Sequence, residues 1–193
     1  NQFSSYQVQK SNHQLQLQVR AKSKVVTSSI IDAPESNPAE FNLAAKKIVI
    51  DPGHGGEDPG AVGVSGVLEK QVNFELAQRV DKLLRQEGFR TLITRNKDQF
   101  VSLSKRAAKA NQWNADILVS LHANFNYKPQ INGTATYAHW HASEKNWALA
   151  WYIQHELLTR TKLQDNGLKA ANFVVLRETR MPAVLVETAF LSN

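Results

Sequence analysis

Two histidines and two glutamates occupy positions in this sequence where a catalytic or metal site would need them. His54, His122 and Glu187 each follow a short run of apolar, mostly β-branched residues. Such runs predict buried strands. Glu69 comes at the start of a predicted helix, directly after a glycine-dense loop. Because the carboxyl ends of parallel strands meet at one edge of an open α/β sheet, we expect the three strand-end residues to emerge together.

Two histidines and one carboxylate, with an open fourth position, form the ligand set of a hydrolytic zinc site. The second carboxylate would then act as the base. The spacing leaves open whether Glu69 or Glu187 is the ligand. Glu69 taken alone is more typical of an acid favoured by a helix dipole. Glu187 at the end of a buried strand is harder to explain that way, because buried carboxylates are rare unless paired or metal-bound.

The glycine-dense loop around His54 has two competing interpretations. The first is a phosphate cradle, but Asp58 stands where a dinucleotide fingerprint has its third glycine, and no Gly-Lys-Ser/Thr follows. The second is an ordinary turn with an incidental histidine. A third interpretation is that His54 is a metal ligand. The other candidate residues support this interpretation, because a metal ligand needs partners elsewhere in the chain.

Other catalytic motifs fail in this chain. His155-Glu156 lacks a second histidine at Thr159, and Gly63-Val64-Ser65 does not continue as a nucleophile elbow. His139 and His141 could share a strand face and bind a metal, but a solvated edge strand is the more ordinary interpretation.

Composition narrows the class of protein. The chain has 193 residues, a net charge of +6, a pI near 9.6 and no cysteine. The size suits one domain with an appendage, and the missing cysteines exclude disulfides and thiol nucleophiles. The basic residues are scattered, which favours a solvated surface over a nucleic-acid site. No apolar run approaches the ~20 residues of a membrane span.

The periodicity predicts a mixed, mostly parallel α/β sheet of about six strands with helices on both faces. Residues 1–45 form an amino-terminal arm or linker, possibly the end of a preceding β domain, with a hairpin around His13 and a linker from Thr27 to Asn42. Residues 46–193 form the main domain. Its predicted helices contain Val72–Leu84, Leu103–Ala110 and Trp147–Leu157, and its predicted strands are 48–50, 91–94, 117–121, 134–138 (possibly at an edge), 173–176 and 183–186.

The sequence from about Lys47 to Asn193 resembles the zinc-dependent N-acetylmuramoyl-L-alanine amidases of the amidase_3 family. The resemblance rests on many ordered matches. They are Ile-Asp-Pro-Gly-His-Gly-Gly at 50–56, Asp58-Pro59-Gly60-Ala61, Leu68-Glu69-Lys70, Asn73, Leu92–Arg95, Asp98, Arg106, Ala110-Asn111, Ala115-Asp116, Ser120–Asn124, Gly133, Val175–Arg177, Pro182–Glu187 and Phe190–Asn193.

The resemblance implies that His54, Glu69 and His122 bind one Zn²⁺ per chain and that Glu187 is the catalytic acid/base. It implies hydrolysis of the amide between the lactyl group of N-acetylmuramic acid and L-alanine of the stem peptide. We further hypothesise that Arg177 binds a stem-peptide carboxylate, the alternative being a surface charge. The partner would be peptidoglycan, with no nucleic acid and no membrane span, and the location extracytoplasmic: periplasm, cell wall or secreted.

Two departures from the family pattern give further expectations. Only Phe125–Asn132 separates the second histidine segment from Gly133, so we expect no built-in helix that blocks the zinc. The family continues past Ser192-Asn193 with a final helix, so we expect a carboxyl-terminally truncated domain, and we expect a monomer. The competing functions are a zinc peptidase that cuts within the stem peptide and a non-catalytic cell-wall-binding module.

Overall fold

The structure is a computed structural model that describes residues 3–11, 14–21, 24–32, 46–128 and 130–192. The chain divides into two compact units, Asn1–Asn42 and Leu43–Asn193. No helix among the described residues is long and apolar enough to cross a membrane.

The first unit is a three-stranded antiparallel sheet. It consists of β1 (Phe3–Ser11), β2 (Gln14–Ala21) and β3 (Lys24–Asp32) in that order. The predicted hairpin is therefore extended by a third strand, which takes the first part of the predicted linker. Valine, threonine and isoleucine in β3 favour a strand despite the serines among them. The predicted turn at His13 and the rest of the linker lie outside the described residues.

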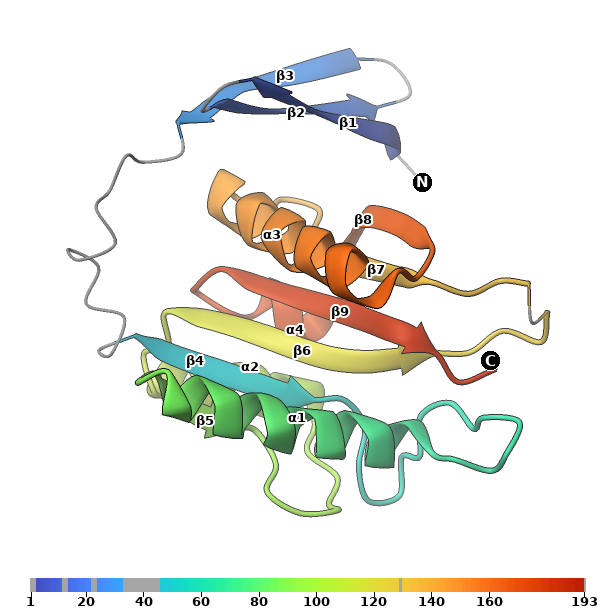
Figure 1. The fold of residues 1–193 in the computed structure, drawn as a ribbon. Helices are drawn as coiled ribbons and strands as arrows, with labels where there is room; N and C mark the ends of the chain where they lie inside the picture. Colours follow the sequence, from blue (N-terminus) through green and yellow to red (C-terminus); the bar gives the residue numbers. More distant parts are fainter. Residues whose placement is uncertain (1–2, 12–13, 22–23, 33–45, 129, 193) are drawn as a thin grey trace. The chain divides into compact units, whose positions relative to one another are not determined.

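The second unit is built on a six-stranded sheet (Figure 1), in the order β5-β4-β6-β9-β7-β8. Neighbouring strands are parallel except for β7 and β9, which are antiparallel. The predicted mixed, mostly parallel sheet is thus confirmed. The strands are β4 (Lys47–Pro52), β5 (Arg90–Ile93), β6 (Ile117–Asn124), β7 (Thr134–His139), β8 (Asp165–Ala171) and β9 (Ala183–Phe190).

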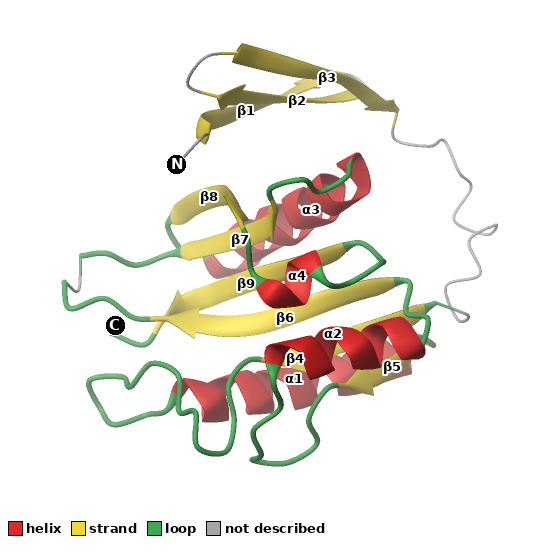
Figure 2. Ribbon diagram, turned by 180° about the vertical axis from the view of Figure 1, so that it is seen from behind, coloured by secondary structure: helices red, strands yellow, loops and turns green. Residues whose placement is uncertain are grey.

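Helices cover both faces of this sheet, as predicted. The helices α1 (Glu69–Gln86) and α3 (Glu144–Thr161) lie on one face (Figure 1). The helices α2 (Leu103–Gln112) and α4 (Val174–Arg177) lie on the other (Figure 2). The two faces arise because successive strand residues point to opposite sides of the sheet.

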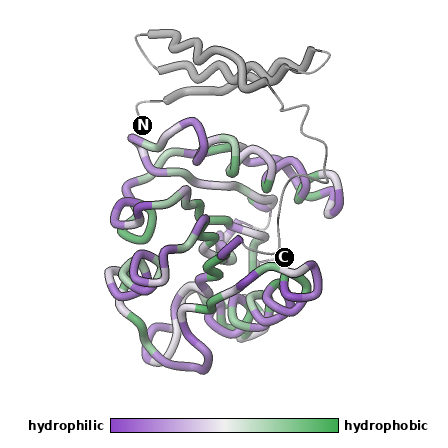
Figure 3. Tube along the Cα trace, turned by 90° about the vertical axis from the view of Figure 1, so that its left-hand side faces the viewer, coloured by the Kyte–Doolittle hydropathy of each residue, from purple (hydrophilic) through white to green (hydrophobic). Residues whose placement is uncertain are grey.

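Each face of the sheet has its own hydrophobic core. Val49, Leu118 and Leu185 pack with residues of α2 and α4, whereas Ile50, Leu121 and Val186 pack with residues of α1 and α3. Hydrophobic residues accordingly gather inside this unit, and hydrophilic residues predominate on its outer loops (Figure 3). These buried strands fix the positions of the residues at their carboxyl ends.

Three local expectations were wrong. The predicted strand 173–176 is mostly the short helix α4, and the strand is β8 before it, because a short apolar run does not distinguish helix from strand. The strand β7 is interior rather than at an edge, because β8 pairs beyond it. Leu103, expected on the inner face of α2, is 53% exposed, and the buried Arg106 takes part in that inner face.

Candidate metal centre

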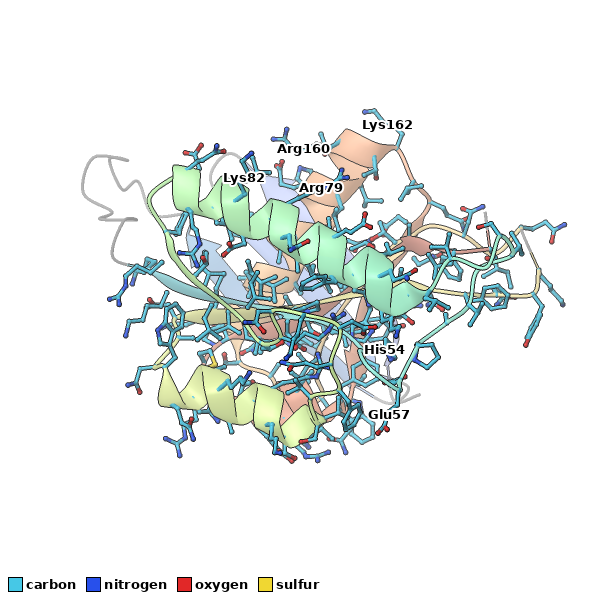
Figure 4. All side chains as sticks on the ribbon, turned by 90° about the horizontal axis from the view of Figure 1, so that it is seen from below. His54, Glu57, Arg79, Lys82, Arg160 and Lys162 are labelled. Atoms are coloured by element: carbon cyan, nitrogen blue, oxygen red, sulfur yellow. The ribbon has the colours of Figure 1, made fainter. Side chains whose placement is uncertain are left out.

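The carboxyl edge of the parallel strands brings the predicted residues together. His54 follows β4, and His122 lies near the end of β6. Glu69 is the first residue of α1, whose amino-terminal end lies near His54 (Figure 4). Glu187 lies within β9, which continues to Phe190, rather than at its end. The edge therefore supplies residues from three neighbouring strands and one helix.

His54, Glu69 and His122 form a group that could hold a metal ion, with one ligand atom from each within 4.8 Å of the others. His54 Nε2 lies 3.2 Å from Glu69 Oε2, and His122 Nδ1 lies 2.9 Å from Glu69 Oε1. Ligand atoms about 2.05 Å from a tetrahedral zinc are roughly 3.3 Å apart. The two histidine–glutamate distances are close to this value, although each involves a different oxygen of Glu69.

The carboxylate of Glu69 is held from several sides. Ala61 N–H donates to Oε2 at 2.8 Å, while Ala123 N–H and Asn73 Nδ2 each donate to Oε1 at 3.2 Å. Burial alone would raise the pKa of Glu69, but the histidine and backbone hydrogen bonds outweigh it and hold the pKa far below its usual range. Glu69 therefore stays ionised, as a metal ligand must.

The orientation of His54 is set by Asp58. His54 Nδ1 lies 2.8 Å from Asp58 Oδ2, which leaves Nε2 directed at Glu69. The hydrogen bond to Glu69 raises the pKa of His54 against the opposing effect of burial. A carboxylate behind a ligating histidine is the usual way in which the ring and its tautomer are fixed.

Two glycines make room for these side chains. A Cβ at Gly53 would lie 2.2–2.7 Å from three ring atoms of His122. A Cβ at Gly60, where φ is +67°, would lie 2.6 Å from both Glu69 Oε2 and His54 Cδ2. The glycine-dense loop thus provides close packing around the candidate ligands, which favours the ligand interpretation of this loop.

Buried arginines hold the backbone of the loop that carries His54. Arg106 donates to Pro52 O at 2.6 Å and to His54 O at 2.8 Å, and Arg95 donates to Gly53 O at 3.1 Å. Asp51 neutralises Arg106 through a 2.9 Å ion pair and also accepts from Ser120 Oγ at 2.8 Å. Three consecutive carbonyl groups are therefore fixed by charged donors.

Glu187 adjoins this group without being part of it. Its Oε2 is buried and has no hydrogen-bond partner among the described residues. Burial raises the pKa of Glu187, and the charge of His122 partly opposes that effect. A buried carboxylate oxygen without a partner is costly unless it faces a ligand or takes part in chemistry.

The remaining candidate histidines and Arg177 lie apart from the metal group. The rings of His139 and His141 lie 5.7 Å apart and are tilted by 58° around the end of β7, and His155 stacks on Trp151 along α3. Arg177 donates to Asn172 Oδ1 at 3.0 Å and pairs with Glu178 at 3.3 Å. No described residue joins them to the metal group through a hydrogen bond.

The supporting residues Asp58, Asn73, Arg95 and Arg106 were not given roles from the sequence. Asp58 was visible as the acid four residues after His54, and Asn73 as a polar residue one helical turn after Glu69. Buried arginines carry no such signal, because arginine is mostly exposed.

The carboxyl edge of this open α/β sheet carries two histidines and a glutamate, with a second, buried glutamate beside them. This arrangement is typical of hydrolytic enzymes that use a metal ion. The chain belongs to the N-acetylmuramoyl-L-alanine amidase family, whose model matches residues 48–193. The resemblance predicted from the motifs is thereby confirmed.

Several relatives of this chain are N-acetylmuramoyl-L-alanine amidases. It is 40% identical over 161 residues to the N-acetylmuramoyl-L-alanine amidase LytC of Bacillus subtilis, covering 82% of this chain and 32% of LytC. It is 39% identical over 149 residues to the sporulation-specific amidase of the same organism, covering 76% and 57%. The chain therefore spans about a third of the length of LytC and somewhat more than half of the length of the sporulation-specific amidase.

Solved structures share the fold. The catalytic domain of CwlV from Bacillus (Paenibacillus) polymyxa gives a TM-score of 0.72 at 39% identity, covering 77% of this chain and 82% of that one. The amidase of Clostridium difficile 630 gives 0.73 at 36% identity, covering 77% and 81%.

Proposed function

We propose that this protein is a zinc-dependent peptidoglycan hydrolase that cleaves the amide between the lactyl group of N-acetylmuramic acid and L-alanine. Family membership and the geometry of the candidate metal group support the substrate class and the reaction. The observation that carries the mechanism is the partnerless buried oxygen of Glu187 beside that group.

His54, Glu69 and His122 would hold one zinc ion. Their donor types are those of hydrolytic zinc sites, and three protein ligands leave a fourth position open. When bound, zinc would lower the pKa of a water ligand and polarise the scissile carbonyl. The buried arginines and Asp58 keep the ligands in place before any ion binds.

Glu187 acts as the acid/base in this proposal. Its carboxylate accepts a proton from the attacking water and returns it to the nitrogen of the departing L-alanine, which cannot leave as an anion. A raised pKa suits this task, because the group must both take and give a proton.

The partner and location follow from the substrate. Peptidoglycan lies outside the cytoplasm, so the protein acts in an extracytoplasmic compartment. The segment between Asn124 and Thr134, described except for Pro129, contains no helix that could cover the metal group. Arg177 remains a predicted contact for a stem-peptide carboxylate, which its exposed position allows.

Digestion of purified peptidoglycan tests the function. The protein is assayed as isolated, after chelation and after zinc is added back. Activity that disappears on chelation and returns with zinc, releasing free muramyl lactate and amino-terminal L-alanine, supports the proposal. Products cut within the stem peptide would instead identify a zinc peptidase, and binding without turnover would identify a wall-binding module.

A further inference from the structure

Three side chains form a row on one face of the sheet, starting beside the metal group. Glu187 of β9 pairs with Ala135 of β7, and Tyr137 of β7 pairs with Lys169 of β8. Residues paired directly across strands, and residues two apart within a strand, project to the same face. Glu187, Tyr137 and Lys169 therefore share the face on which α2 and α4 pack (Figure 2).

The outer member of the row is a cation that forms no ion pair within the described part of the chain. Lys169 is exposed, its Nζ lies 5.7 Å from the centre of the Tyr137 ring, and no hydrogen bond or ion pair engages it among the described residues. An ammonium held over an aromatic face is positioned before a ligand arrives.

Arg177, the cation suggested by the sequence, is engaged differently. Its guanidinium already donates to Asn172 and pairs with Glu178. A carboxylate ligand would have to compete with these contacts, whereas Lys169 has no such contact to lose. The structure thus favours Lys169 as the cation available to a substrate.

We propose that Lys169, supported by Tyr137, binds the free α-carboxylate of the second residue of the stem peptide and so determines substrate specificity. This inference rests on the proposed function, because the position of the scissile amide beside Glu187 defines where the second residue lies. It adds a carboxylate-binding position to the metal group and base.

The dimensions are compatible with this assignment. Two strand spacings of about 4.8 Å and a two-residue offset of about 3.4 Å per residue separate the Cα atoms of Glu187 and Lys169 by roughly 12 Å. The extended side chain of Lys169 spans about half of this Cα–Cα distance. Two extended peptide residues cover about 7 Å. A carboxylate on the second residue beyond the scissile bond would therefore come within reach of Lys169.

The test uses two muramyl tripeptides that differ only at the second residue, with a free α-carboxylate in one and a carboxamide in the other. We expect the wild-type protein to cleave the carboxylate form with a kcat/KM about tenfold higher, as for a charge-assisted hydrogen bond. Lys169→Met should reduce the preference for the carboxylate form to less than about twofold, because the variant lacks the ammonium group that would bind the carboxylate. Lys169→Arg should retain it, and Lys145→Met, at another exposed lysine, is the matched control.

Binding separates failure of this inference from failure of the proposed function. Affinities of both tripeptides are measured by calorimetry in Glu187→Gln, with and without Lys169→Met. If the wild type cleaves neither tripeptide but the carboxylate form binds more tightly through Lys169, the function is wrong and the carboxylate site stands. Equal cleavage and equal binding of the two forms, or an equal loss for both in Lys169→Met, would overturn the site.

Discussion

His122 and Glu187 lie directly opposite each other on the parallel strands β6 and β9. This register places a candidate metal ligand and the proposed base on adjacent backbones, so their separation is set by strand pairing and not by loops. The backbone is fixed further where Thr188 Oγ1 donates to His122 O at 2.9 Å. Rigid strands are more precise supports for catalytic groups than loops are.

Replacement of the base should separate turnover from metal binding. In Glu187→Gln we expect kcat to fall by about 10²- to 10⁴-fold, the usual contribution of a general acid/base, while zinc content is unchanged. Muropeptide release and metal analysis of the same sample measure both. Turnover that persists near the wild-type rate would show that another group takes the proton.

Loss of the acid behind His54 should weaken metal binding without abolishing it. Asp58→Asn removes the carboxylate that fixes the His54 ring, and such changes reduce metal affinity by about 10- to 100-fold. Competition with a chelator of known affinity gives the value. Glu57→Gln is the matched control, because Glu57 is a neighbouring exposed acid (Figure 4). Equal affinity in both variants would remove Asp58 from the site.

The glycines around the ligands should differ in what their substitution disturbs. Gly53→Ala forces a Cβ into the His122 ring, so we expect the protein to lose its metal. Gly66→Ala meets nothing within 4 Å and costs only the strain of φ +79°, on the order of 1 kcal/mol of unfolding free energy. Zinc content and denaturant unfolding of the two variants test this contrast. Full zinc occupancy in Gly53→Ala would contradict the packing argument.

The buried ion pair should matter far more than a surface pair. Arg106→Met leaves the Asp51 charge buried without its partner, which costs about 3–5 kcal/mol of unfolding free energy. Arg160→Met breaks an exposed pair with Glu156 and should cost less than about 1 kcal/mol. Both are measured by denaturant unfolding. Similar losses in the two variants would argue against the network around the His54 loop.

The parts of the fold that the sequence predicts well are those with strong local patterns. The runs before His54, His122 and Glu187 are apolar and β-branched, so their strands and common edge could be inferred. The strand β8 could not, because Asp165–Ala171 is mostly polar or small and lies at the sheet edge. Its partner contacts, not its own composition, make it a strand.

Within the site, the candidate ligands and the candidate base were easier to predict from the sequence than the residues that hold them in place. Residue type alone nominated the histidines and glutamates, and the structure brings them together. The spacing could not decide between Glu69 and Glu187 as ligand, because that depends on side-chain geometry across 118 residues of chain. The supporting roles of Arg95 and Arg106 could not be predicted, because the carbonyl groups that accept their hydrogen bonds become neighbours only when α2 and the loop pack on the sheet.

The antiparallel pairing of β7 with β9 divides the working edge of the sheet into two portions of different origin. On one side, strands end at the edge and carry His54, His122 and the proposed base Glu187. On the other side, β7 begins at this edge with Thr134 opposite Asp165 of β8. The segment from β7 to β8 contributes no candidate metal ligand, yet it carries Tyr137 and Lys169. If Lys169 recognises the substrate as proposed, exchange of this segment would alter recognition without replacing any candidate metal ligand.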